Sequence, residues 1–282
     1  MINRYSREKI SKIWTRQNKF DIWLKIECLI AEKLAINGKI PKKDALNIKK
    51  RAKFNIKEIE KIEEKTKHEV IAFINNVSSY IGESSKYFHH GITSSDIMDT
   101  AFSVQLKQSA ELIIKELNSL LKIIKIKALK HKNTIMIGRT HGIHAEPITF
   151  GLKLATFYSE FKRNLTRLEE AKKEISICSI SGPVGTYNSV DPSIESFVAK
   201  KMGLNVEKIS TQIIPRDRHA VYFSVLGILA SSIERLATEI RHLQRTEILE
   251  VEEYFEKNQT GSSAMPHKKN PILSENLTGL SR

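Results

Sequence analysis

The sequence predicts an all-α protein, in which a small N-terminal helical domain precedes an elongated bundle of long helices. Hydrophobic residues make up 40% of the 282 residues, which is enough to form a substantial core. Only seven prolines and twelve glycines interrupt the chain. Apolar residues recur over long stretches at positions i, i+3, i+4 and i+7, which is the period of an amphipathic helix.

The N-terminal part, up to about residue 85, is typical of several short helices joined by polar turns. The pair Asn37-Gly38, followed by Pro41, indicates a helix end. We expect one domain to cover residues 1–93 and the long-helix bundle to cover residues 94–282. The last residues, GLSR, carry no helix stop, so we expect a truncated chain and an incomplete bundle.

Three long runs form the predicted bundle, at residues 94–132, 147–177 and 215–243. The second begins at Pro147, a favourable residue for a first helical turn. Each run is roughly 30 residues long, well above the usual helix length of about 11–12. We therefore expect their apolar faces to pack on partner helices, including helices of other subunits.

The net charge of +14 leaves three classes of partner open: nucleic acid, an anionic membrane surface or a polyanionic small substrate. A general preference for lysine would give the same charge without any partner. The lysines are spread along the chain, with no arginine-rich block and no interleaved aromatic residues. Nucleic-acid binding is therefore disfavoured.

The sequence also favours a soluble, cytoplasmic protein. The N-terminus, MINRYSREKISKIW, has charges scattered through it and no apolar region of a signal peptide. The apolar stretch VLGILA is far too short to span a bilayer. Cys28 and Cys178 lie in apolar surroundings, which indicates two buried thiols rather than a disulfide.

Loop one, residues 88–96, reads FHHGITSSD. It offers hydroxyl and amide groups at a helix N-terminus, where the helix dipole favours anions. Ser95 or Asp96 could instead simply cap the helix. Three hydroxyl groups beside two histidines favour a ligand site.

Loop two, residues 138–147, reads GRTHGIHAEP. His141 lies between a threonine and a glycine, where it is free to exchange protons. His144 is followed closely by Pro147, so we expect it to orient the loop or to cap the next helix. A structural histidine is one alternative. A metal site of His141, His144 and Glu146 is another, but the spacing differs from HExxH, and we expect no metal.

Loop three, residues 261–271, reads GSSAMPHKKNP. Ser262 or Ser263 can act as a base only if nearby groups stabilise the alkoxide, and this loop offers backbone amides, His267, Lys268 and Lys269. No GxSxG motif and no preceding strand support a serine hydrolase. A polar connector between two helices is the alternative.

Together, the loops supply hydroxyl groups, cations and histidines, but few carboxylates. This set suits a multiply anionic substrate that loses a proton next to a carboxylate. Because such a C–H group is weakly acidic, its removal needs a positioned base and donors that hold the developing charge. A separate acid must protonate the leaving group.

These segments resemble the fumarase/aspartase superfamily of homotetrameric lyases, whose members share a GSSxMPxKxNP loop. Within the superfamily, the chain is most similar to the adenylosuccinate lyase family, over essentially its whole length. The resemblance rests on RYSR at the start, TKHEVIAF, HGITSSDIMDTA, GRTHGIHAEPITFGLK, ISGPVGTY, STQ followed by RDRH, and GSSAMPHKKNP. Argininosuccinate lyase is the nearest alternative.

The resemblance implies an enzyme that eliminates fumarate from adenylosuccinate to give AMP, and from the succinyl-carboxamide ribotide of purine synthesis. It implies no metal or organic cofactor. It also implies a small anionic nucleotide substrate and a homotetramer whose active sites combine loops from three subunits.

The same resemblance assigns roles to particular residues. Ser262 would remove the β proton, with Ser263 as an adjacent binder and the weaker candidate for the base. His141 would protonate the leaving nitrogen, and His68 would hold the substrate near that nitrogen or its phosphate. The other implied binders are Arg4 and Tyr5 at the phosphate end, Thr93 and Ser94 at the succinyl carboxylates, Lys268 and Asn270 at the same end with Asn276 nearby, Gln212 at the succinyl or base region, and Lys67, Glu69 and Lys269.

The chain departs from the family pattern in three places. Lys67-His68-Glu69 stands where the family usually has Arg-His-Asp, and lysine is a poorer bidentate anion clamp than arginine. Ser95 stands where threonine is common, which is a mild change. Relatives also continue into further bundle helices and a small C-terminal domain. A catalytically silent helical oligomerisation module and a basic nucleic-acid-binding protein therefore stay open as alternatives.

Overall fold

The computed structural model describes residues 2–257, 259–265 and 267–282, and it confirms the all-α prediction. The chain divides into two compact units. Unit 1 contains the residues up to Leu112 together with Lys172–Arg218, and unit 2 contains Ile113–Ala171 with His219–Arg282. The domain boundary expected near residue 93 stays a prediction.

Unit 1 is built mainly from helices, as the polar turns in its sequence predict. One correction concerns length, since the second helix has 21 residues and is not short. It ends where expected, with Asn37 as its C-cap and Gly38 at a φ of +71°. The elements are η1 (Asn3–Tyr5), α1 (Glu8–Ile13), α2 (Arg16–Ile36), α3 (Lys42–Arg51), α4 (Ile56–Thr66), α5 (Glu69–Ile81), η2 (Gly82–Tyr87), the start of α6 (Ser94–Lys130), α8 (Pro192–Met202), and the parallel strands β3 (Ile177–Cys178) and β4 (Asn205–Val206).

The core of unit 1 is centred on an aromatic cluster between α2 and α5. Phe20 stacks on Phe73 with ring centroids 5.5 Å apart, and Trp23 meets Phe73 edge-on at 5.4 Å. All three side chains are buried almost completely. Large aromatic side chains bury much apolar surface each, so this cluster holds the two helices together.

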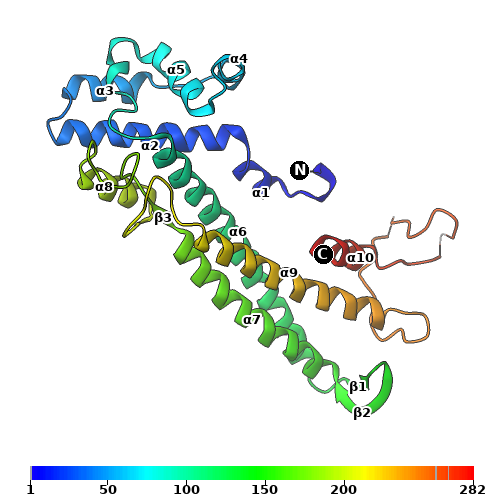
Figure 1. Cartoon of the computed structure of the whole chain (residues 1–282). Helices are drawn as coiled ribbons and strands as arrows, with labels where there is room; N and C mark the ends of the chain where they lie inside the picture. Colours follow the sequence, from blue (N-terminus) through cyan, green and yellow to red (C-terminus); the bar gives the residue numbers. More distant parts are fainter. Residues whose placement is uncertain (1, 258, 266) are drawn as a thin grey trace. The chain divides into compact units, whose positions relative to one another are not determined.

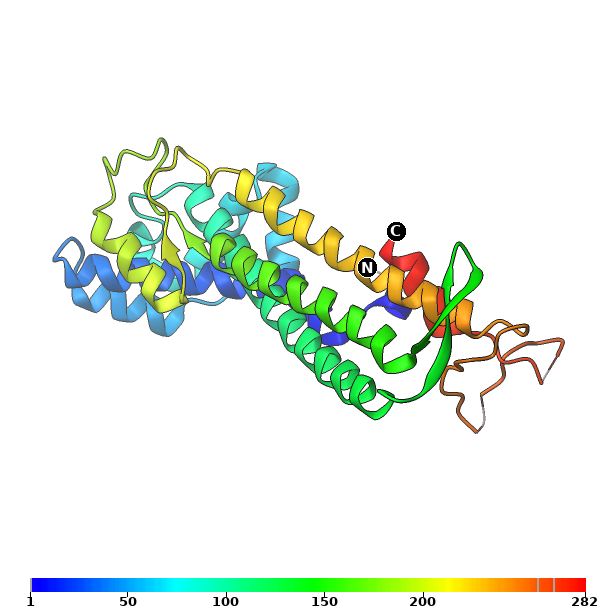
Figure 2. The ribbon, with the colours of Figure 1, turned by 90° about the horizontal axis from the view of Figure 1, so that it is seen from below.

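Unit 2 is a layer of long helices. Its elements are the C-terminal part of α6, the antiparallel hairpin of β1 (Ile135–Thr140) and β2 (Ile143–Thr149), α7 (Phe150–Ile175), α9 (Asp217–Leu243) and α10 (Ile272–Ser281). Figures 1 and 2 show this part of α6, α7 and α9 running side by side, with the hairpin at the end where α6 passes into α7.

The three long helices confirm the predicted bundle, but the second one begins later than expected. Pro147 lies in β2 opposite Ile137, and α7 begins at Phe150. Proline is tolerated there because a strand at the edge of a sheet does not need every amide donor. Gly151 then lets α7 approach α6 closely, since a Cβ there would lie 2.4 Å from the carbonyl oxygen of Ala128.

Helix α9 is long and apolar enough to cross a membrane by composition alone, with a mean hydropathy of 1.4 over its most apolar window. Its polar side chains, however, pair with α7. Ser232 bonds Asn164 at 2.7 Å, and Arg235 Nε donates to Glu160 at 2.8 Å. Because its polar side chains bond to a neighbouring helix, α9 is better interpreted as a helix of the bundle in unit 2 than as a membrane span.

Replacing Phe73 by alanine should destabilise unit 1 by about 3–5 kcal/mol, because it leaves a cavity between two aromatic neighbours. Chemical denaturation followed by circular dichroism measures the change. Ile36→Ala is the matched control, since Ile36 is 60% exposed and its loss should cost little. Equal effects of the two substitutions would contradict the aromatic cluster as the centre of the core.

Candidate functional site

The residues predicted for the site occur in both units, and each group is described by itself. Unit 1 carries Arg4, Tyr5, Lys67, His68, Glu69, Thr93, Ser94 and Gln212. Unit 2 carries His141, Ser262, Ser263, Lys268, Lys269, Asn270 and Asn276.

The last three residues of loop one, 94–96, form the start of α6, so the hydroxyl groups of the loop lie at a helix N-terminus as predicted. The carboxylate of Asp96 is buried and accepts hydrogen bonds from the amides of Thr93 at 2.8 Å, Ser181 at 3.1 Å and Gly182 at 3.3 Å. Burial raises the pKa of Asp96, and the three amide bonds counteract that rise. Asp96 thus caps α6 and also fixes the ISGPVG segment beside loop one.

Asp99 lies one helical turn after Asp96 and binds another segment, which contains Ile214 and Arg216. Its carboxylate accepts a hydrogen bond from the amide of Ile214 at 2.8 Å and a bidentate pair from Arg216 at 3.0 and 2.9 Å. Ser210 bonds Ser179 at 2.8 Å, at the other end of the same segment. The structure therefore brings the segment that carries Gln212 to the loops around Thr93 and Ser94. Sequence analysis noted Asp96 only as a cap and missed Asp99.

One of the two histidines of loop one is held inside unit 1. The carboxylate of Glu27 is buried, accepts the amide of His89 at 3.1 Å and lies 2.5 Å from its Nδ1 atom. His89 also has a left-handed φ of +57°. The contact with Glu27 therefore fixes the position of loop one. It indicates that His89 helps to hold the loop in place.

The Lys67-His68-Glu69 triplet forms the junction between α4 and α5. Lys67 ends α4 at a φ of +53°, and His68 caps α5, with Nδ1 accepting the amide of Ile71 at 3.3 Å. An accepting Nδ1 leaves the proton of the neutral ring on Nε2, which is then free to donate. Glu69 pairs with Lys19 at 2.5 Å and with Arg16 at 3.2 Å.

Arg4 and Tyr5 lie in η1 at exposed positions. The guanidinium carbon of Arg4 lies 5.9 Å from the centre of the Tyr5 ring. This distance allows a cation–π contact between the two side chains. Their predicted role at a phosphate group stays a prediction.

Loop two is a tight β-hairpin, which the sequence analysis did not foresee. Thr140 pairs with Ile143, and the two residues between them, His141 and Gly142, have φ values of +55° and +81°. Two positive φ values are the requirement of a type I′ turn, which is why glycine follows the histidine. The turn presents His141 at the exposed tip of the hairpin.

His144 does not cap a helix as expected. It lies on β2 opposite Arg139, and α7 begins six residues later. Arg139 in turn donates two hydrogen bonds to Glu250, at 2.8 and 2.9 Å. This pair lowers the pKa of Glu250 and ties the hairpin to the segment after α9.

Loop three lies in the long connection between α9 and α10, immediately before α10. The backbone at its start lies against the backbone near its end. Pro266 lies outside the described residues. Gly261 is buried, and a Cβ there would lie only 2.0 Å from the carbonyl oxygen of Lys268, so this position requires glycine. The side-chain amide of Asn270 donates to the carbonyl of Gly261 at 2.8 Å.

The hydroxyl oxygen of Ser262 accepts hydrogen bonds from the amides of Ala264 and Met265, each at 3.3 Å. Amide donors favour the ionised form of the group that accepts them, as they do in an oxyanion hole. Within the described part of loop three, only the hydroxyl of Ser262 shows such donors. This geometry distinguishes Ser262 from Ser263.

The side chain of Gln244 joins the segment that precedes loop three to the C-terminal part of the loop. Its carbonyl oxygen accepts the amide of Glu253 at 3.0 Å, and its amide nitrogen donates to the carbonyl of Lys269 at 3.2 Å. The carboxylate of Glu253 accepts the amides of Leu273 and Ser274 and thereby caps α10. Nothing in the sequence pattern had pointed to Gln244 or Glu253.

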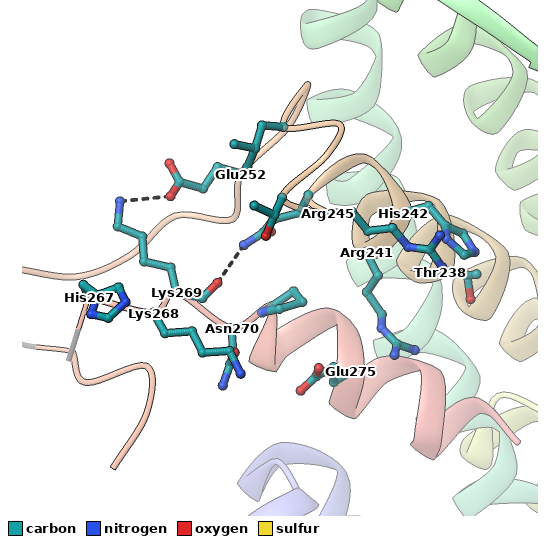
Figure 3. Close-up of a pocket in the computed structure, with 14 residues that line it drawn as sticks. Thr238, Arg241, His242, Arg245, Glu252, His267, Lys268, Lys269, Asn270 and Glu275 are labelled. Carbon is teal, nitrogen blue, oxygen red and sulfur yellow. Dashed lines mark hydrogen bonds and ion pairs between the residues drawn. The ribbon is translucent and has the colours of Figure 1, made fainter. Parts of the chain in front are cut away.

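A cavity of about 740 Å³ lies between α9, the end of loop three and α10 (Figure 3). Lys268, Lys269 and Asn270 line it, but the residues that line it do not include Ser262, Ser263 or His141. Lys269 pairs with Glu252 at 2.9 Å. Sequence analysis missed the other polar residues of the lining: Thr238, Arg241, His242, Gln244, Arg245, Thr246 and Glu275.

The cysteines are both free thiols, and Cys178 is buried as predicted. Burial raises its pKa, which keeps the thiol protonated. Cys28 is only half-buried, a correction to the prediction, and burial raises its pKa to about 11. Among the described residues, no group of three histidine, cysteine, aspartate or glutamate side chains is placed to hold a metal ion.

Replacing Asp96 by alanine should destabilise unit 1 by about 1–3 kcal/mol, because three amides lose the acceptor that binds them. Hydrogen exchange should become faster at Thr93, Ser181 and Gly182, and denaturation measures the stability. Glu64→Ala, which removes an exposed carboxylate of α4, is the control. Unchanged exchange at these three amides would show that Asp96 does not hold the loops together.

Comparisons with known proteins agree with the resemblance seen in the sequence. A family model described as lyase matches residues 3–282. The chain is 53% identical to adenylosuccinate lyase of Streptococcus mutans and 52% identical to that of Bacillus subtilis, over all 282 residues. It spans 65% of the length of each of these two relatives.

Solved structures show the same fold. A fumarate lyase from Mesorhizobium superposes with a TM-score of 0.86 at 28% identity, over 98% of this chain and 63% of the other. The 3-carboxy-cis,cis-muconate lactonizing enzyme of Pseudomonas putida gives 0.89 at 27% identity, over 98% and 64%. Because the family model covers nearly every residue and the fold agrees, the chain belongs to this lyase family.

Proposed function

We propose that the protein is a C–N lyase that eliminates fumarate from adenylosuccinate to give AMP, and from the succinyl-carboxamide ribotide of purine synthesis. The proposal rests mainly on one observation: the hydroxyl oxygen of Ser262 accepts hydrogen bonds from two backbone amides in loop three. The identity of 52–53% to two adenylosuccinate lyases supports the choice of substrate.

The proposed reaction needs one base and one acid. The Ser262 alkoxide removes a proton from the carbon next to a carboxylate, and the electron pair of that C–H bond forms the double bond of fumarate. The C–N bond breaks, its electrons pass to nitrogen, and His141 protonates that nitrogen. The amides of Ala264 and Met265 offset the cost of ionising Ser262.

The binding residues supply the charge complement of the substrate. Thr93 and Ser94 stand at the N-terminus of α6, where the helix dipole favours the succinyl carboxylates. Lys268 and Asn270 bind the same end in this proposal, with Lys269 and Asn276 beside them. Arg4, Tyr5, Lys67, His68 and Gln212 hold the nucleotide part.

Two contacts bear on the proposed binders. Glu69 already pairs with Lys19 and Arg16, which favours a role in fixing the junction beside His68 over direct contact with the substrate. Asn270 already donates to Gly261, so its carbonyl oxygen and second amide hydrogen are what it can offer to a ligand.

We further propose a cytoplasmic homotetramer that works without a cofactor and shares its active sites between subunits. The exposed apolar residues Val221 and Ile228 of α9 are seven residues apart, so they lie on one face of the helix, and they support partner helices on this face. The resemblance to the superfamily implies active sites that combine loops from different subunits, so assembly would bring the Ser262 base of one copy to the His141 acid of another. A catalytically silent helical module is the second candidate, and the assays below separate the two.

Ser262→Ala should lower the rate of adenylosuccinate cleavage by several orders of magnitude, while the substrate still binds, because the base is lost. An absorbance assay measures cleavage, both on the 282-residue chain and on a version extended to the length of its relatives. Ser263→Ala is the matched control and should retain most activity. The reverse pattern would move the base by one residue, and no cleavage by either wild-type form would favour the silent module.

His141→Gln should suppress cleavage by roughly 10²–10⁴-fold, the usual contribution of a general acid. The limb of the kcat profile that reports the protonated acid should vanish in this variant. His144→Gln, on the strand below the same turn, is the control and should affect kcat less. If His141→Gln keeps the wild-type kcat and that limb, the proton donor lies elsewhere and His68 becomes the first candidate.

A further inference from the structure

The cavity beside α10 carries more positive charge than its own carboxylates can neutralise. Four lysine and arginine side chains line it against Glu252 and Glu275, which leaves a surplus of two positive charges with the histidines neutral. Glu252 is already paired with Lys269. Glu275 therefore stands alone against the remaining three cations, Arg241, Arg245 and Lys268.

Two of these cations come from α9 and the bend that follows it. Arg241 lies in the last turn of α9, one turn after Thr238, and Arg245 lies in the bend just beyond the helix end at Leu243. Figure 3 shows Arg241 and His242 extending from α9, with Lys268 and Asn270 on the side formed by loop three. The lining thus combines one arginine of α9, one arginine of the bend after it and one lysine of loop three.

The helix dipole gives a structural reason for Arg241, because it favours a cation in the last turn of a helix. That reason does not extend to Arg245 and Lys268, which lie outside α9. Arg241 is half-buried, and within the described part of the chain its guanidinium has no ion pair. A half-buried cation without a counterion is better explained by a ligand that supplies the negative charge.

We propose that Arg241 and Arg245 form an oxyanion subsite in this cavity, with Lys268 opposite, which takes a phosphate or carboxylate group. The planar guanidinium group presents paired donors that match both kinds of oxyanion. As a subsite for the substrate, this inference rests on the proposed function, since that substrate carries both groups. Its anion binding, however, can be measured with no reaction at all.

The test is a calorimetric titration of the 282-residue chain with inorganic phosphate and, separately, with succinate, at low ionic strength. We expect saturable binding, with Arg241→Gln and Arg245→Gln each weakening it about tenfold, the loss expected for one charge-assisted hydrogen bond. Glu275→Gln should strengthen binding, because it removes the unpaired carboxylate. A preference for phosphate or for succinate shows which group of the substrate the subsite takes.

Lys122→Gln is the matched control, since it removes the same charge from an exposed position of α6 and should leave binding unchanged. Arg241→Lys keeps the charge without the planar group, so it should bind with intermediate affinity, and circular dichroism confirms that each variant folds. Absence of saturable binding, or an equal loss in Lys122→Gln, would overturn the subsite. Phosphate binding that depends on both arginines, without any cleavage of adenylosuccinate, would keep the subsite and reject the proposed function.

Discussion

The arrangement of loops in unit 1 depends on two carboxylates in the first turns of α6. Asp96 and Asp99 are one turn apart and each is buried or nearly so, yet each accepts bonds from segments far away in the sequence. Burying a carboxylate costs free energy unless several donors satisfy it, and here amides and one guanidinium group do so. The N-terminus of one helix therefore organises three loops at once, which is how residues near 93 and 212 come into one cluster.

Loop three is organised differently, through its own backbone and three amide side chains or carboxylates. Gly261 leaves room for the carbonyl of Lys268, and the side chain of Asn270 donates to the carbonyl of Gly261. Gln244 binds Lys269 near the end of the loop, and Glu253 binds the start of α10 that follows it. A loop closed in this way can keep an internal geometry, including the two amides at Ser262, while its position relative to other parts changes. Such a loop is compatible with a base that forms only around bound substrate.

The positive charge of the chain has two distinct origins. Most lysines are dispersed and exposed, which agrees with a general preference for lysine and does not favour nucleic acid. The cations beside α10 are different, because they are concentrated in one cavity and exceed the carboxylates there. Net charge alone could not separate these cases, because it contains no information about which side chains share a surface.

The sequence by itself determined the helical class, the three long helices and the three unusual loops, because helical periodicity and turn residues are local properties of the chain. It also determined the family, since the motifs in those loops are continuous. Only the tertiary structure decided that loop two is a hairpin with His141 at its turn, and that Pro147 belongs to a strand. It alone identified Asp99, Gln244 and Glu253, because each bonds groups many residues away, and Arg241, because it lines a cavity together with residues of loop three. Such pairings depend on how the chain folds back on itself, and no local pattern records them.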